Sequence, residues 1–261
     1  MSAFKMMDYK NTYFLAQSLL TRLPTPQLID IRAVDAGRSA LFYPLIGLLI
    51  GLLLYVPLLF FSQTSLLLSA ALVVTLWAWI TGGLHLDGLA DSADGWLGGS
   101  LDKADKQKTL AIMKDPLVGS AGVIVIVCVL LLKFAVLSAI FQQTFHGALS
   151  NFGIIIIAPI IGRAMILLMM LSSENANPNS MANQVVDNLP RPPALWLTAL
   201  CLLVGAYFSL SGIILVLITF WLLRRLMLQR LGGFTGDTLG ATVEICEVAY
   251  LVGAVLMVNY A

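Results

Sequence analysis

Charged side chains are scarce in this chain of 261 residues, where Asp, Glu, Lys and Arg together make up 11%. Average globular chains carry about 25% charged residues, so the composition excludes an ordinary soluble domain. The net charge is only +1 and no basic stripe is present, which excludes a nucleic-acid binder. The three cysteines lie far apart in apolar runs and predict neither a disulfide framework nor a zinc site. We also expect no cleavable signal, because the start lacks a compact apolar core and a cleavage site.

Uncharged apolar sequence, in contrast, is abundant, in windows of roughly 20 residues that predict membrane-spanning helices. We expect seven spans, at residues 40–61, 65–81, 118–140, 152–171, 194–211, 212–229 and 238–259. Residues 9–20 form a helix too short to cross, which we expect to lie at the interface or to re-enter. The sequence therefore predicts an all-α, polytopic integral membrane protein in which residues 1–261 form one membrane-embedded domain.

The basic residues predict how the chain is oriented. All but two of the 15 lysines and arginines (Lys133 and Arg163) fall on one side of the predicted bundle. That side comprises the N-terminus, the adjoining end of the sixth span and the loops 81–117, 172–193 and 230–237. The connections on the other side, near 62–64, 141–151 and 209–212, contain no charged residue. By the positive-inside rule the N-terminus and the first set of loops are cytoplasmic.

An acidic motif follows the second span. Asp87, Asp91 and Asp94 stand at i, i+4 and i+7, on one face of a helix. Three carboxylates this close repel one another unless a cation binds them, and Mg²⁺ with its oxygen ligands is the natural one. A solvated acidic helix start is the alternative, although it accounts for one acid better than for three. We expect residues 82–117 to be a cytoplasmic Asp-rich catalytic loop, with a surface helix over 101–114.

A second glycine-rich and acidic motif, residues 231–247, opens the last span. A glycine pair precedes Asp237 by the same interval as another pair precedes Asp87. Glu244 then follows Asp237 by seven residues, as Asp94 follows Asp87. Either a pseudo-duplication with two helix starts facing each other or chance in a glycine-rich chain explains this repeat.

Four charged residues are expected inside the spans: Lys133, Arg163, Glu244 and Glu247. A lone charge at that depth costs several kcal/mol, so each must face a partner, an ion or a cavity. Arg163 could pair with one of the glutamates, which is a structural role. It could equally bind a phosphate through its planar fork of donors. Both interpretations stay open at this point.

These residues predict a reaction class. Mg²⁺ held by acids neutralises a diphosphate and its leaving group, and a carboxylate not committed to metal can accept the proton of an attacking hydroxyl. Glycines beside the acids let phosphates come near. The sequence chemistry therefore predicts metal-dependent transfer at a nucleotide or prenyl diphosphate on the cytoplasmic face. It does not identify the acceptor.

Residues 81–95 and 232–241 resemble the signature of the cobalamin synthase family, the adenosylcobinamide-GDP ribazoletransferases. Shorter matches stand in the family's order at residues 18–24, 43–47 and 113–115. The resemblance implies a transferase of the bacterial cytoplasmic (inner) membrane with its active site facing the cytoplasm. It would couple adenosylcobinamide-GDP with α-ribazole, or α-ribazole 5′-phosphate, to give adenosylcobalamin, or its 5′-phosphate, and GMP. Its partners would be Mg²⁺, these substrates and the bilayer, with no nucleic acid and with homo-oligomers left open.

The site residues are assigned from spacing and from the resemblance. We expect the catalytic acids to be Asp87, Asp91 and Asp94. The Mg²⁺ ligands would be those three together with Asp237 and Glu244. The expected substrate contacts are Gly83, His85, Arg22, Lys114, Asp115, Arg163 and Gly236.

Three alternatives remain at the level of the sequence. A CDP-alcohol phosphotransferase of lipid synthesis has similar chemistry, but its aspartates are spaced differently. Gly and Arg stand between the first aspartates of that pattern, and a longer interval precedes the last pair. A prenyltransferase would carry paired Asp-rich motifs, whereas the second motif here has one Asp and two Glu. An ion-coupled membrane transporter would use the four intramembrane charges as a relay.

Overall fold

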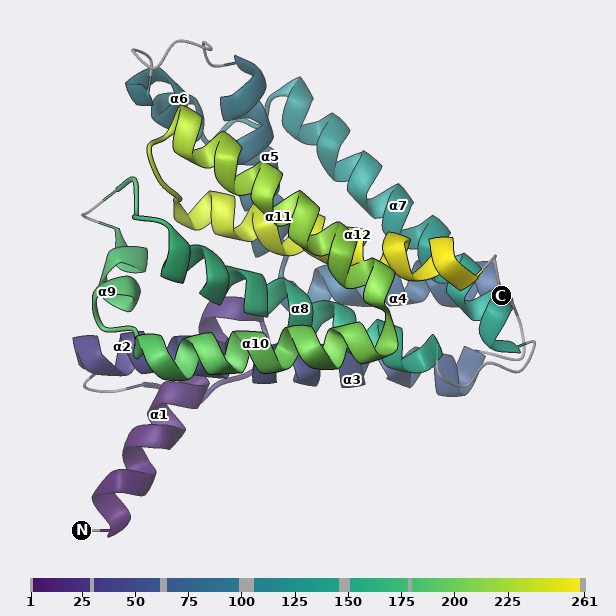
Figure 1. The fold of residues 1–261 in the computed structure, drawn as a ribbon, viewed down its shortest axis with the longest axis horizontal. Helices are drawn as coiled ribbons and strands as arrows, with labels where there is room; N and C mark the ends of the chain where they lie inside the picture. Colours follow the sequence, from purple (N-terminus) through teal and green to yellow (C-terminus); the bar gives the residue numbers. More distant parts are fainter. Residues whose placement is uncertain are drawn as a thin grey trace.

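In the computed structural model, which describes residues 2–28, 31–61, 65–98, 106–145, 151–177 and 180–258, the chain forms a bundle of α-helices (Figure 1). The helices are α1 (Ser2–Leu20), α2 (Ala33–Ser39), η1 (Ala40–Phe42), α3 (Tyr43–Phe61), α4 (Leu66–Thr81), α5 (Leu84–Gly98), α6 (Lys106–Ile112), α7 (Ser120–Phe145), α8 (Asn151–Ser172), α9 (Met181–Asp187), α10 (Arg191–Phe208), α11 (Leu210–Arg230) and α12 (Gly236–Val258). Within the described ranges, the β-structure consists of one isolated bridge between Asn175 and Phe234.

The seven predicted spans correspond to α3, α4, α7, α8, α10, α11 and α12, which confirms the all-α polytopic class. Six stretches are long and apolar enough to cross a membrane alone, and a seventh results if α4 and α5 are one span bent by 87°. The division between α10 and α11 has a physical cause at Ser209. Its hydroxyl accepts a hydrogen bond from the Gly212 amide at 2.9 Å and so caps the start of α11.

The shorter helices agree less closely with the prediction. The expected helix over residues 9–20 is present as α1 and is longer. The helix expected over 101–114 is described only as α6, since residues 101–105 lie outside the described residues. Helices α2 and α9 were not predicted, because seven residues are too few to show a clear helical period. These short helices and the start of α12 gather at one end of the bundle, on the left in Figure 1.

Helices α8 and α12 form the centre of the bundle. Within their most apolar window 78% of the residues are buried, against 22% for α7 and α10, which expose apolar side chains as a lipid-facing surface does. The α3–α8 contact depends on small residues: a Cβ on Gly47 would lie 2.5 Å from the Pro159 carbonyl oxygen, and one on Gly51 would lie 2.5 Å from that of Ile156. Glycine at these positions lets two helix backbones touch.

Candidate active site

The acidic motif begins with a turn that requires glycine. Gly82 and Gly83 have φ values of 63° and 69°, in the left-handed region that residues with a Cβ rarely adopt. Their amides donate to the carbonyls of Trp79 and Ala78, each at 3.0 Å, and so close the end of α4. After this turn the chain bends by 87° into α5, which carries the three aspartates across the end of α4.

The two glycine-rich motifs then meet where α5 crosses the start of α12. A Cβ on Gly88 would lie 2.6 Å from the Asp237 carbonyl oxygen, and one on Gly240 would lie 3.2 Å from the His85 Cα atom. The close crossing brings Asp87 and Asp237 to the wall of one cleft, although 150 positions separate them in the chain. The structure therefore brings together two of the predicted acids that belong to different motifs.

Asp87 and Asp91 keep their carboxylates available. Asp87 is exposed and Asp91 is half-buried, and neither carboxylate makes a hydrogen bond or ion pair with the part of the chain that the structure describes. Burial raises the pKa of Asp91 to about 6, and the negative charges of Asp87, Asp237 and Asp94 act in the same direction. Such mutual repulsion is what a bound cation would relieve.

Asp94 has a different environment. One carboxylate oxygen accepts from the Gly119 amide at 2.7 Å, and the other accepts from the Gly122 amide at 2.9 Å. These amides belong to the start of α7, so Asp94 satisfies donors that a helix leaves unpaired. A Cβ on Gly122 would lie 2.6 Å from the carboxylate, which explains the small residue there. The spacing predicted a third metal ligand, whereas the structure places Asp94 as a cap.

The donor set fits a magnesium–phosphate complex better than a cage made of protein ligands. Among the residues described, no group of three or more His, Cys, Asp or Glu side chains is arranged to hold a metal ion. Mg²⁺ commonly takes only one or two carboxylates and completes its shell with substrate phosphates and water. Asp87 and Asp91, with Asp237 at the facing helix start, are hard oxygen donors of this kind.

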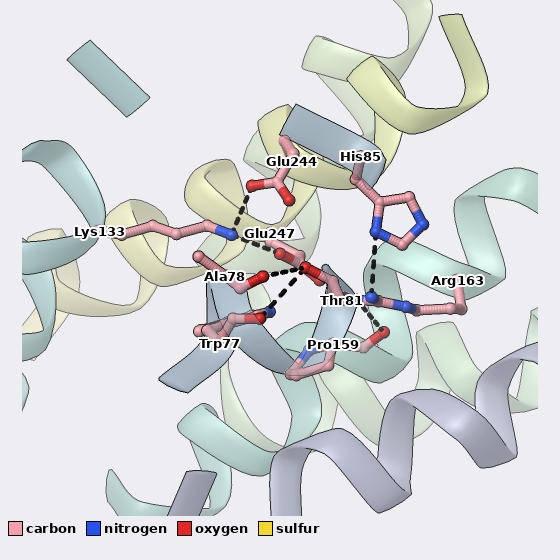
Figure 2. A network of polar contacts seen from close by, with 9 residues as sticks. All are labelled: Trp77, Ala78, Thr81, His85, Lys133, Pro159, Arg163, Glu244 and Glu247. Atoms are coloured by element: carbon pink, nitrogen blue, oxygen red, sulfur yellow. Dashed lines mark hydrogen bonds and ion pairs between the residues drawn. The ribbon is translucent and has the colours of Figure 1, made fainter. Parts of the chain in front are cut away.

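The intramembrane charges form one buried network (Figure 2). Lys133 Nζ lies 2.7 Å from Oε2 of Glu244 and 2.7 Å from Oε2 of Glu247, and Arg163 pairs with Oε1 of Glu247. The Trp77 ring lies against Lys133, with its centroid 4.1 Å from Nζ. Two cations thus balance two carboxylates in the core.

This network shows where two residues predicted to contact substrate or metal lie. Arg163 is completely buried and bonded to Glu247, so the structural pairing is observed and Arg163 lines neither cleft described below. Glu244 is engaged by Lys133, so the structure does not bring it to the acids of α5 as the spacing predicted. We therefore leave Glu244 out of the metal set.

His85 connects the network to the site. Its Nδ1 lies 3.4 Å from Arg163 Nη2, as Figure 2 shows. A guanidinium can only donate, so Nδ1 accepts and the ring carries its proton on Nε2. His85 also lines the same cleft as Asp87. The sequence predicted a substrate contact at His85, and the structure gives the residue a position both against the buried network and on the cleft wall.

Two clefts adjoin the start of α12. The larger, of about 350 Å³, is lined by His85, Asp87, Gly236 and Asp237 and by apolar side chains of several helices, among them α1 and α8. The smaller, of about 250 Å³, contains Lys114 and shares Gly236 and Asp237 with the first. The predicted contacts His85, Lys114 and Gly236 thus border a cleft.

Three further predicted contacts lie elsewhere. The Arg22 side chain packs over Gly82, since a Cβ there would lie 2.2 Å from Arg22 Cγ, and it supports the turn before α5. Gly83 has open space above it but lines neither cleft. Asp115 accepts from the Leu117 amide at 3.0 Å and closes its own turn.

Sequence reasoning missed the polar side chains that the loop after α8 adds to the smaller cleft, Asn177 and Ser180. The amides of Ala176 and Phe234 donate to the carbonyls of Phe234 and Glu174, at 2.8 and 3.0 Å, and join this loop to the segment before α12. No local pattern in the sequence signals a contact of this kind between two loops.

An all-α bundle that spans the membrane, with carboxylates and open clefts at two facing helix starts, is the architecture of a membrane-embedded enzyme with an acidic active site. The chain belongs to the cobalamin-5-phosphate synthase family, whose model matches residues 12–255.

Three curated relatives, each named adenosylcobinamide-GDP ribazoletransferase, are similar to this chain over nearly its whole length. That of Stutzerimonas stutzeri is 46% identical over 244 residues, covering 92% of this chain and 93% of the relative. That of Pseudomonas fluorescens Pf-5 is 44% identical over 248 residues, covering 94% and 98%. That of Pseudomonas putida F1 is 42% identical over 244 residues, covering 94% and 98%. No solved structure matches this chain. Membership of this family sets aside the lipid phosphotransferase, the prenyltransferase and the transporter.

Proposed function

We propose that this protein couples adenosylcobinamide-GDP with α-ribazole, or with α-ribazole 5′-phosphate, and releases GMP. The names of its relatives support the substrates. The observation that carries the proposal is the position of Asp87 and Asp237, from two distant motifs, on the wall of one cleft. This is where a diphosphate and an attacking hydroxyl must meet.

The reaction is a transfer at phosphorus. The 3′-hydroxyl of the ribazole attacks the phosphorus that carries the corrinoid arm, and a new P–O bond forms. The bond from that phosphorus to the oxygen bridging to GMP breaks, and GMP leaves with the electron pair. A carboxylate of the Asp87, Asp91 and Asp237 group accepts the hydroxyl proton.

The same three aspartates are the residues that would hold Mg²⁺. The bound ion would neutralise the diphosphate and stabilise the charge on the leaving GMP. His85 presents Nε2–H as a hydrogen-bond donor beside Asp87, and the tautomer is set by Arg163. Lys114 adds a positive charge for phosphate in the smaller cleft.

We place this site at the cytoplasmic face of the bacterial inner membrane. The positive-inside distribution of Lys and Arg supports this orientation, because the acidic loop lies on the side that carries the basic residues. The short helices α2 and α9 lie at the same end of the bundle as the start of α12 (Figure 1).

The test is GMP release by the purified protein in liposomes. We expect release from adenosylcobinamide-GDP only when α-ribazole and Mg²⁺ are both present, and loss of release when a chelator removes the metal. Asp87→Asn should lower kcat/KM by roughly 100-fold or more, since it removes several kcal/mol of transition-state stabilisation. Asp187→Asn, on the exposed end of α9, is the matched control and should change little. Unchanged turnover in Asp87→Asn at saturating Mg²⁺ would refute the assignment.

A further inference from the structure

The larger cleft is lined by two chemically different groups of residues. One group is Asp87, Asp237 and His85, which the proposed reaction uses. The other group is apolar and includes Leu15 and Leu19 of α1, Ile166 and Met170 of α8, and Leu239 of α12. The cleft therefore offers apolar walls together with the reacting carboxylates.

We infer that the apolar walls of this cleft bind the aromatic base of the acceptor nucleoside, with its ribose directed toward Asp87 and Asp237. The inference rests on the proposed function and adds to it which substrate occupies which cleft. A base held among the leucines of α1 would bring the ribose hydroxyls to the carboxylates that line the same cleft. The attacking hydroxyl would then reach the carboxylates without a second binding site.

The size of the cleft separates the two substrates. Its volume of about 350 Å³ is near the lower limit of roughly 300–1,000 Å³ typical of small-ligand pockets. A bicyclic base with part of its ribose suits such a space. The corrin ring, with its amide side chains and axial ligands, is several times larger and must remain outside. The occupant is therefore the acceptor, or the guanosine of the donor.

The chemistry of the walls favours the acceptor over guanosine. The 5,6-dimethylbenzimidazole of α-ribazole carries two methyl groups, and once it is joined to ribose it has no N–H group. Guanine carries an amino group, an N–H and a carbonyl, and each costs free energy when buried without a hydrogen-bond partner. Apart from His85, Asp87 and Asp237, the polar side chains that line the cleft are Gln184 and Tyr43. Such a wall suits the methylated base.

The smaller cleft leaves room for the donor. It meets the larger one at Gly236 and Asp237 and is lined by Lys114, Asn177 and Ser180, which suit phosphate and ribose oxygens. Two substrates entering from the two clefts would meet at Asp237. This arrangement predicts that the affinities for the two substrates can be changed separately.

The experiment narrows the cleft with a larger apolar side chain and measures both Michaelis constants. Ala36, half-buried on α2, lines the cleft, whereas Ala33 on the same helix is exposed and does not. Ala36→Leu should raise the KM for α-ribazole about tenfold or more, as expected when methylene groups overfill an apolar pocket, with the KM for adenosylcobinamide-GDP within about twofold of wild type. The unmethylated benzimidazole riboside should recover much of the loss, because it needs less space. Ala33→Leu is the control and should change neither constant.

A second variant and a binding measurement keep the test decisive. Leu19→Phe fills the cleft from α1 and should give the same split between the two constants. Binding of α-ribazole alone, measured from its own fluorescence in the absence of donor, should weaken in both variants. A rise in the KM for adenosylcobinamide-GDP alone, or no change in either constant, would overturn the inference. A wild-type protein that releases no GMP would instead refute the proposed function.

Discussion

Replacing Lys133 with methionine tests whether the buried charges act as one unit. Lys133 bonds to both Glu244 and Glu247 at 2.7 Å, and its side chain is 3% exposed. Methionine has a similar length and is apolar, so the substitution removes the charge with little change in packing. Two carboxylates would then remain in the core with Arg163 as their one partner in the network.

The magnitude follows from the cost of an uncompensated buried charge. Removing one partner of a buried pair typically destabilises a protein by about 3–5 kcal/mol, and the double contact of Lys133 argues for the upper half of that range. Adding Glu244→Gln removes the extra negative charge and leaves the Glu247–Arg163 pair neutral. The double variant should therefore recover roughly 0.5–3 kcal/mol, the usual size of coupling between residues in contact.

The assay is thermal unfolding of the purified variants in detergent. A loss of about 3–5 kcal/mol should lower the Tm by roughly 6–20 °C in a chain of this size, and the double variant should unfold at a higher temperature than Lys133→Met alone. Glu244→Gln alone completes the double-mutant cycle. If the two single effects simply add in the double variant, the network is not energetically coupled and this reasoning is wrong.

Two further predictions separate the roles of residues at the site. Gly236→Ala should fold normally, because its Cβ would meet nothing within 4 Å, yet it should lower kcat/KM about tenfold by filling the wall shared by the two clefts. Gly98→Ala, whose nearest neighbour would be 3.4 Å away, is its control and should leave the rate unchanged. Asp94→Asn should weaken the cap of α7 and cost about 0.5–2 kcal/mol in thermal unfolding, while keeping most of the activity that Asp87→Asn loses. A loss of turnover as large as that of Asp87→Asn would instead make Asp94 a catalytic acid.

Much of the fold could be predicted from the sequence because it depends on local properties. A helix must be long and apolar to cross a bilayer, and all seven expected spans are present as helices. The acidic and glycine-rich motifs could also be recognised, since the turn at Gly82 and the helix that follows are set by neighbouring residues. The family could be recognised from the same two motifs.

The partners of these residues, in contrast, depended on how the helices pack. Asp94 and Asp87 look alike in the sequence, but the amides at the start of α7 donate to Asp94, which therefore becomes a helix cap. From the sequence, Arg163 could contact either the substrate or a glutamate. The packing of α8 against α12 brings it to Glu247. The sequence looks the same whether a charged side chain binds a metal, a phosphate or another side chain. Its role is decided by which charge lies nearest after folding, and only the tertiary structure determines that.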